Sequence, residues 1–343
     1  MTKDDSLLMK GIAILLMLFY HLFNQMRYVD LCDCLIYIGD APAVYILSRA
    51  ANPVAFFLVL GGYGMYKVWK KGDRHRWSRV FKLYLHFWFI MAVFVTIGNY
   101  VKPEMYPGSF LSFVVNMSSI VTVYNGEMWF LFPYVLLSLL SPWLFRLVTD
   151  IKAEYVIAVA LLIHLATSFL ISRYGGSYIY ARPLLYNAIL IPHLMFNFML
   201  GAMAARQRFF ETIGCKLKSL APVWTNCLCL GGVIVLISVS CVFKYNYFYS
   251  FLFISCALFL YYPKWIKTIL RNLGSQSMNM WMIHSWFCYH LFPAFTYSFK
   301  YPLIIFAVLI IISYLCGKLT DLILMPVERL LLTRPEMKEK PVI

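Results

Sequence analysis

Apolar segments of about 20 residues recur along the whole chain, and this repetition constrains the fold more than any other feature of the sequence. The chain is 62% hydrophobic and only 13% charged, whereas a soluble domain averages about 25% charged residues. Backbone groups inside a bilayer must be satisfied within the protein, so a spanning chain forms helices or a closed barrel. The alternating pattern of a membrane barrel is absent. The sequence therefore predicts an all-α, multi-pass integral membrane protein.

We expect about ten transmembrane helices in a single membrane domain that covers residues 1–343. Their expected ranges are 7–26, 50–69, 80–100, 127–147, 153–171, 183–204, 222–243, 247–263, 273–295 and 300–326. The segment 107–125 is apolar but rich in Ser, Asn and Thr, and we interpret it as a re-entrant or interfacial piece. Residues 327–343 are expected to form a short cytoplasmic tail.

Basic residues are distributed unevenly between the two faces that these segments define. With the N-terminus inside, 23 of the 30 Lys and Arg residues fall at the inner face and seven at the outer face. Positively charged loops remain in the cytoplasm, so both termini are expected to be cytoplasmic. The net charge of +15 largely reflects this bias, and we expect no nucleic-acid partner. The nine Cys residues show no zinc-ligand spacing, so no metal site is expected.

The first apolar segment, KGIAILLMLFYH, begins with Lys10 and ends with His21. Eleven residues correspond to within roughly 20° of three helical turns and to about 16 Å along the axis. Both side chains should therefore lie on one face of the helix. Lys10 is either an inner anchor that reaches the headgroups or a ligand for an anion. His21 is either a packed histidine or a functional group, and an ionisable residue inside a span favours function.

A second basic cluster, KVWKKGDRHRWSRVFKLYLHFW, covers residues 67–88 at the inner face. Arg76, Arg79 and Lys82 are spaced by three, so a helix would place them along one side. Such a row suits a polyanion, and arginine is well matched to phosphate. The alternative is an ordinary positively charged loop that attracts anionic lipid.

Together these clusters resemble the membrane acyltransferase 3 family, the multi-pass O-acyltransferases of bacterial cell-surface glycans. Members carry a basic residue, ten residues and a His in the first span, and an Arg-x-x-Arg motif that enters the third. The resemblance covers about residues 5–326 in order. The matching segments are MKGIAILLMLFYHLF, FFLVLGGYGMY (56–66), RVFKLYLHFW (79–88), NGEMWFL (125–131), FNFMLGAMAAR (196–206) and LGSQSMNMWMIHSW (273–286).

The chain departs from the family pattern at four positions. Lys10 and Lys82 stand where the family has Arg, Leu85 stands where Pro is usual, and Trp281 stands where Tyr is usual. Lysine keeps the charge but lacks the planar fork of arginine. With lysine at these two positions, the sequence does not determine the geometry in which the acyl donor would bind.

The resemblance implies transfer of an acyl group, usually acetyl, from acyl-CoA at the cytoplasmic face to a glycan hydroxyl. Lys10, Arg79 and Lys82 would hold the CoA phosphates, with Arg76 as a weaker contributor. His21 would either deprotonate the acceptor or become transiently acylated. Acetyl-CoA is then a donor substrate and no bound cofactor is expected. Other expected partners are the glycan acceptor and membrane lipid, in the inner membrane of a bacterium.

Three further residues are candidates to line the site. His284 falls in the family-like MIHSW segment, and Glu127 and Trp129 lie at the outer end of the fourth expected span. The alternative for His284 is structural packing, and for Glu127 it is simple solvation. His164 and His193 match no motif, and we interpret them as helix–helix contacts.

Two other functions compete with the enzyme. A proton-coupled transporter or flippase of a glycan or anionic substrate could use His21, Lys10 and His284 as a relay. The paired, broken spans typical of transporters are not found by inspection. A degenerate family member could also serve as a scaffold, given its lysine substitutions.

Overall fold

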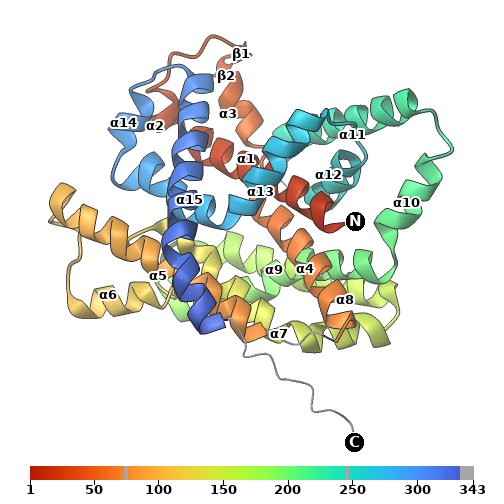
Figure 1. The fold of residues 1–343 in the computed structure, drawn as a ribbon, viewed down its shortest axis with the longest axis horizontal. Coiled ribbons are helices and arrows are strands. Elements are labelled where there is room, and N and C mark those ends of the chain that lie inside the picture. Colours follow the sequence, from red (N-terminus) through yellow and green to blue (C-terminus); the bar gives the residue numbers. More distant parts are fainter. Residues whose placement is uncertain (73–75, 244–246, 333–343) are drawn as a thin grey trace, which may run out of the picture.

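A computed structural model describes residues 1–72, 76–243 and 247–332, and almost all of its regular structure is helical (Figure 1). In chain order the elements are α1 (Lys3–Phe23), α2 (Met26–Val29), β1 (Tyr37–Ile38), β2 (Ala41–Pro42), α3 (Ala43–Ser48), α4 (Pro53–Lys70), α5 (Arg76–Val101), α6 (Phe110–Met117), the 3₁₀ helix η1 (Gly126–Phe130), α7 (Leu131–Asp150), α8 (Ala153–Tyr174), the π-helix η2 (Gly175–Ile179), α9 (Pro183–Arg206), α10 (Phe209–Leu217), α11 (Pro222–Val242), α12 (Tyr249–Leu258), α13 (Lys264–Ser285), the π-helix η3 (Trp286–His290), α14 (Pro293–Tyr297) and α15 (Pro302–Leu332). Strands β1 and β2 form a short antiparallel hairpin.

The all-α, multi-pass membrane fold predicted from the sequence is confirmed. Within the described ranges, eight helices are long and apolar enough to cross a membrane, against the ten expected. These are α1, α4, α5, α7, α8, α9, α11 and α15. Of the other two expected spans, 247–263 contains α12, which has only ten residues. The span 273–295 overlaps the second half of α13, all of η3 and the start of α14, and this part of α13 carries polar residues such as Gln276 and Asn279.

Two boundary expectations are modified by the structure. The segment 107–125 contains the short helix α6, and Asn116 at its end bonds the backbone of Ser112 and Tyr124. Helix α15 continues to Leu332, into the expected tail. Residues 333–343 lie outside the described residues. So do five of the basic residues counted above, namely Arg74, Lys244, Arg334, Lys338 and Lys340.

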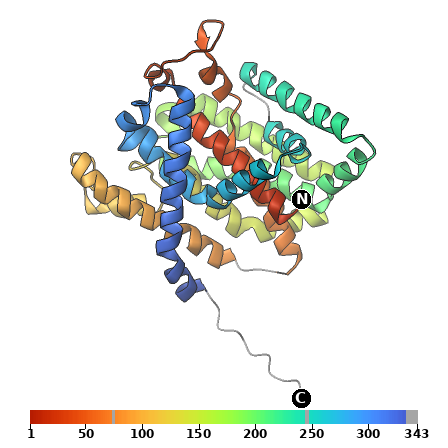
Figure 2. The ribbon, with the colours of Figure 1, turned by 45° about the horizontal axis from the view of Figure 1, so that its top comes forward.

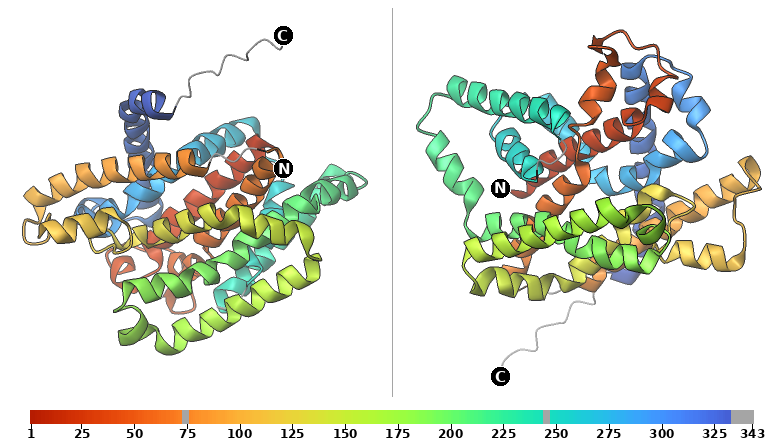
Figure 3. Two further views of the ribbon diagram at one scale, coloured as in Figure 1. Left: turned by 90° about the horizontal axis from the view of Figure 1, so that it is seen from below. Right: turned by 180° about the vertical axis from the view of Figure 1, so that it is seen from behind.

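Helix α1 begins in a capping box and runs through the middle of the bundle (Figures 1 and 2). The Thr2 hydroxyl accepts a hydrogen bond from the Asp5 amide at 3.1 Å, and Thr2 N–H donates to the Asp5 carboxylate at 2.7 Å. These two bonds satisfy donors that a helix start otherwise leaves unpaired. Helix α11 lies at the edge of the bundle (Figure 2), and α7 and α8 both pack against α9 (Figure 3).

Two helix pairs make the closest contacts in the fold, and glycines permit both. A Cβ atom on Gly11 of α1 would lie 2.0 Å from the Leu270 carbonyl oxygen of α13, and one on Gly274 would lie 1.8 Å from Leu7 O. Between α4 and α9, a Cβ on Gly62 would lie 1.9 Å from Phe198 O. Small residues let membrane helices approach backbone to backbone, and these two crossings hold α1 and α4 at the centre.

We expect Gly62→Ala to lower the melting temperature of the detergent-solubilised protein, because the new methyl group forces α4 away from α9. The matched control is Gly64→Ala on the same helix, where a Cβ meets nothing within 4 Å. Alanine is favoured over glycine in a helix by roughly 1 kcal/mol, so the control should be neutral or slightly stabilised. Equal melting temperatures for the two variants would contradict the close crossing.

Candidate functional site

Helix α1 presents Lys10, Met17 and His21 to two neighbouring cavities, as their spacing predicts. The inner cavity, of about 190 Å³, is lined by Lys10 and Met17. The outer cavity, of about 660 Å³, is lined by Met17 and His21. "Inner" and "outer" refer to the orientation expected from the basic residues. One helix therefore contributes a cation to one cavity and an imidazole to the other.

The two cavities share three wall residues, Met17, Phe130 and Trp281. The rings of Phe130 and Trp281 meet edge to face, with their centroids 5.6 Å apart. Both side chains are buried. These three apolar side chains therefore lie between the inner cavity and the cavity that His21 lines.

His21 is buried between a carboxylate and a tyrosine. Its Nε2 lies 3.3 Å from a Glu127 carboxylate oxygen, and its Nδ1 lies 3.3 Å from the Tyr289 hydroxyl. Tyr289 donates its own proton to the His21 carbonyl oxygen. The tyrosine oxygen can then accept a hydrogen bond from Nδ1–H, which leaves the lone pair of Nε2 beside Glu127. In the tautomer that carries its proton on Nδ1, Nε2 can accept a proton as a general base requires, and Glu127 then lies beside the imidazolium that forms.

Glu127 is positioned by the first turn of η1. The Asn125 side-chain oxygen accepts hydrogen bonds from Glu127 N–H at 3.2 Å and from the Ser285 hydroxyl at 2.8 Å. Asn125 is almost fully buried. This cap fixes the start of the turn against the end of α13, and the turn directs Glu127 and Trp129 into the outer cavity.

Three other histidines lie near His21 or line the outer cavity, namely His164, His193 and His284. His284 is fully buried, with its ring centroid 4.9 Å from that of His21, and its Nδ1 donates to Trp281 O at 2.7 Å. His164 donates from Nδ1 to the His193 carbonyl oxygen at 2.7 Å, and the two rings stack at 4.1 Å. This bond is the helix–helix contact that we predicted. Both residues also line the outer cavity, which the sequence did not indicate.

The expected donor-binding residues divide into two groups. Lys10 lines the inner cavity with Tyr134, and Arg79 interacts electrostatically with both of them. Arg76 is buried, with its guanidinium carbon 5.8 Å from the Phe145 ring centroid. Lys10 and Arg79 are thus brought together beside the inner cavity, whereas Arg76 packs against α7.

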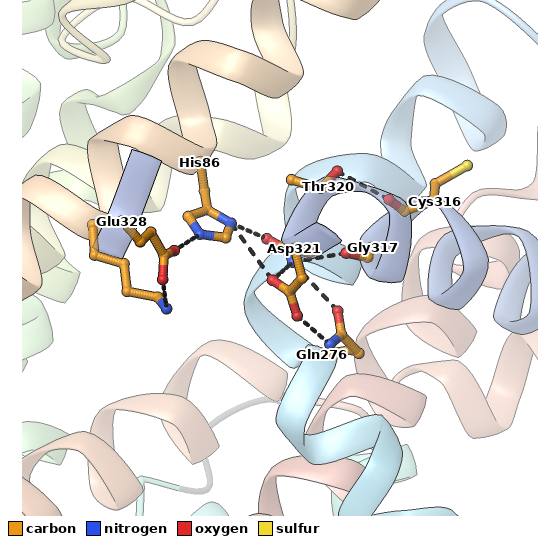
Figure 4. Close-up of polar contacts among 9 residues, drawn as sticks. His86, Gln276, Cys316, Gly317, Thr320, Asp321 and Glu328 are labelled. Carbon is orange, nitrogen blue, oxygen red and sulfur yellow. Dashed lines mark hydrogen bonds and ion pairs between the residues drawn. The ribbon is translucent and has the colours of Figure 1, made fainter. Parts of the chain in front are cut away.

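Lys82 belongs to a different cluster, which joins α5, α13 and α15 (Figure 4). Its Nζ pairs with Glu328 at 2.7 Å, and the other oxygen of Glu328 lies 2.5 Å from His86 Nε2. His86 Nδ1 lies 2.7 Å from the Asn279 side-chain oxygen. Asn279 and Gln276 in turn donate to Asp321 at 2.8 and 2.5 Å. A CoA phosphate would therefore compete with Glu328 for Lys82.

A third set of charges ties several chain segments together at the inner face. Glu211 of α10 accepts hydrogen bonds from Lys67 at 2.8 Å and from the N-terminal ammonium at 3.2 Å. Burial opposes ionisation of this carboxyl, but the bonds from Lys67, its own backbone amide and the N-terminus outweigh burial and lower the pKa of Glu211 to about 2. The start of α1, the end of α4 and α10 therefore meet on the side where Lys10 lies.

Several site residues could not be found from the sequence. Tyr289 and Asn125 contact the His21–Glu127 pair, and Arg49 and Asn197 line the outer cavity. Tyr289 and Arg49 lie outside the motifs quoted above. Asn125 and Asn197 lie inside the NGEMWFL and FNFMLGAMAAR segments, but nothing in those segments signals their contacts. Within the described ranges, no group of three or more His, Cys, Asp or Glu residues is placed to hold a metal ion.

Comparison with known proteins gives one match. Residues 7–318 match a family model described as an acyltransferase domain. The match covers α1 to the middle of α15, and so includes both cavities and the His21–Glu127 pair. No curated protein and no solved structure matches the chain.

Proposed function

The chain belongs to the acyltransferase 3 family, and on this premise we propose that it transfers an acetyl group from acetyl-CoA to a hydroxyl of a cell-surface glycan or glycan precursor. The observation that carries the proposal is the placement of the His21–Glu127 pair in the outer cavity, separated from Lys10 by a wall of three residues. Donor and acceptor would then approach one imidazole from opposite faces of a bacterial inner membrane.

The inner cavity supplies the features that a CoA donor needs. Lys10 and Arg79 offer cationic groups for its phosphates. Lys82 would also bind a CoA phosphate once it breaks its ion pair with Glu328. Arg76 would be a weaker contributor at the same face. The cavity is otherwise lined mainly by apolar and aromatic groups, such as Phe57, Leu83 and Phe130. An acyl-pantetheine arm is thin and weakly polar, so it suits this passage between the CoA phosphates and His21.

The outer cavity supplies the chemistry of the transfer. His21 Nε2 removes the proton from the acceptor hydroxyl, whose oxygen then forms a bond with the thioester carbonyl carbon. The C–S bond breaks, and the departing thiolate takes a proton from the imidazolium. Glu127, 3.3 Å from Nε2, stabilises the positive charge that the imidazole gains. Transient acylation of His21 is the alternative, and the two routes differ in whether label remains on the protein.

The proposal is tested by two measurements on the purified protein in detergent. Acetyl-CoA at 100 times its dissociation constant should stabilise the fold by about 2.7 kcal/mol, visible as a higher melting temperature. Lys10→Ala should weaken this shift, whereas Lys264→Ala, an exposed lysine at the start of α13, should leave it unchanged. Acetyl-labelled donor incubated with bacterial surface glycans should then give an alkali-labile ester on the glycan.

Two results would count against this function. A well-folded protein with no melting shift at saturating acetyl-CoA would remove acetyl-CoA as donor. A normal shift without labelled ester on any glycan, and without release of free CoA, would favour a scaffold over an enzyme.

A further inference from the structure

A third cavity, of about 590 Å³, adjoins the outer cavity and is not used by the proposed transfer. We call it the side cavity. It is lined by residues of α1, α3, α11 and α12 and by the segment between α3 and α4. Four residues line both it and the outer cavity, namely Tyr20, Asn24, Arg49 and Asn52. The acceptor space therefore has two chambers with a polar junction.

Arg49 places a fixed positive charge at this junction. It follows directly on α3, and its guanidinium lies 4.8 Å from the ring centroid of Tyr45. Among the described residues it forms no ion pair and no hydrogen bond through its side chain. The guanidinium thus lies over an aromatic ring and belongs to a residue that lines both cavities. Guanidinium groups bind carboxylates and phosphates through two parallel hydrogen bonds.

No acidic side chain among the described residues that line the two cavities pairs with Arg49. Glu127 is the carboxylate that lines the outer cavity, and it is already engaged with His21. The described residues around the side cavity include no Asp or Glu. Within the described part of the chain, an anionic ligand in the side cavity would therefore meet Arg49 and no competing carboxylate.

Unpaired polar atoms line both chambers. In the outer cavity the side-chain oxygen of Asn197 is buried without a hydrogen-bond partner. In the side cavity the hydroxyls of Ser240 and Tyr249 are in the same state. Asn197 is 7% exposed and Tyr249 only 2%. Buried polar atoms in native proteins are normally satisfied. A small rotation of these side chains would turn the three atoms toward the cavities, where a ligand with hydroxyl or amide groups would satisfy them.

Resting on the proposed acyl transfer, we propose that the acceptor is an acidic glycan that fills both chambers and binds Arg49 through its carboxylate or phosphate. One sugar unit lies in the outer cavity, with a hydroxyl at His21 and another polar group at Asn197. The next unit lies in the side cavity, against Ser240 and Tyr249. Arg49 holds the anion between them and so sets which hydroxyl reaches the imidazole.

Binding without donor tests this inference separately from catalysis. The probes are a uronate-containing oligosaccharide with its carboxyl-reduced form, and a phosphodiester-linked oligosaccharide with its unphosphorylated backbone. Wild-type protein should bind at least one acidic probe tenfold or more tightly than its neutral counterpart. Arg49→Gln should abolish this preference and leave binding of the neutral form unchanged, whereas Arg49→Lys should keep part of it.

The matched control is Arg182→Gln. Arg182 also lies over a tyrosine, 4.1 Å from the Tyr178 ring centroid, but it lines neither cavity. This variant should retain the full preference. Equal binding of acidic and neutral probes by wild type, no binding of any probe, or an unchanged preference in Arg49→Gln would each overturn the acidic-glycan site. If wild type binds an acidic probe but transfers no acyl group, the proposed function is wrong, whereas the acidic-glycan site is supported.

Discussion

His21→Ala is expected to reduce acetyl transfer by about 10²- to 10⁴-fold, the usual contribution of a positioned general base. The variant should fold and insert normally, because the ring it loses faces a cavity and Tyr289 keeps its hydrogen bond to the backbone carbonyl of residue 21. The measurement is the initial rate of labelled ester formation at saturating acetyl-CoA. The melting shift with acetyl-CoA should persist, since the donor's phosphates would bind at Lys10 and Arg79.

The same variant separates the two chemical routes. If His21 acts as a base, acid-quenched wild-type protein should carry no label after exposure to acetyl-CoA alone. If His21 is acylated, the wild type should retain label and His21→Ala should not. His164→Ala serves as the control, because this residue also lines the outer cavity but forms its hydrogen bond with the His193 carbonyl oxygen and not with Glu127. Full transfer by His21→Ala would remove the imidazole from the mechanism.

The parts of this protein that the sequence predicted depend on periodicity. Apolar runs of membrane length predicted the helical fold, and the eleven-residue spacing placed Lys10 and His21 on one face of α1. Both signals are local, because each follows from the geometry of a single helix. Eight described helices qualify as spans by length and composition where about ten were expected, and the difference lies at α12 and α13. Helix α12 is too short to cross a membrane. In α13, polar residues that form hydrogen bonds with α15 interrupt the run of apolar residues.

The sequence predicted Glu127 as a candidate to line the site, but the contacts that position it and His21 come from distant parts of the chain and were not predicted. Glu127 meets His21 through a 3₁₀ turn that an asparagine caps, and Tyr289 reaches the same ring from a π-helix. The motifs found in the sequence predict neither the 3₁₀ turn nor the π-helix. Lys82 was expected to face a phosphate, yet its partner Glu328 lies 246 residues away in the sequence.

Arg49 and the side cavity are the clearest case of a feature hidden from the sequence. An arginine in an outer loop is ordinary, and nothing in the neighbouring residues distinguishes it from Arg173 or Arg182. Its meaning comes from the absence of an acidic partner among the described residues and from the cavities that meet beside it. A sequence shows that a charged residue lies in a span. It does not show whether the folded protein places an acidic partner beside a basic residue.

Glu127→Gln is expected to lower kcat by about 10²-fold, the scale of losing one electrostatic contact made to charge that develops in the transition state. The amide keeps the size of the side chain but cannot balance the imidazolium that forms on His21. Because Glu127 lines the outer cavity and not the inner one, KM for acetyl-CoA should remain within about twofold, since only interactions gained in the transition state are lost.

Two comparisons give this prediction its specificity. Glu127→Asp keeps the charge about one methylene further from Nε2, so it should recover part of kcat. Asn125→Ala removes the cap that directs the turn without touching the charge, and it should lower kcat as well, because the carboxylate is no longer held at 3.3 Å from the ring. A purely structural Glu127 would instead make both substitutions at this position lower the melting temperature and raise KM together. Unchanged kcat in Glu127→Gln would leave His21 to act without a carboxylate.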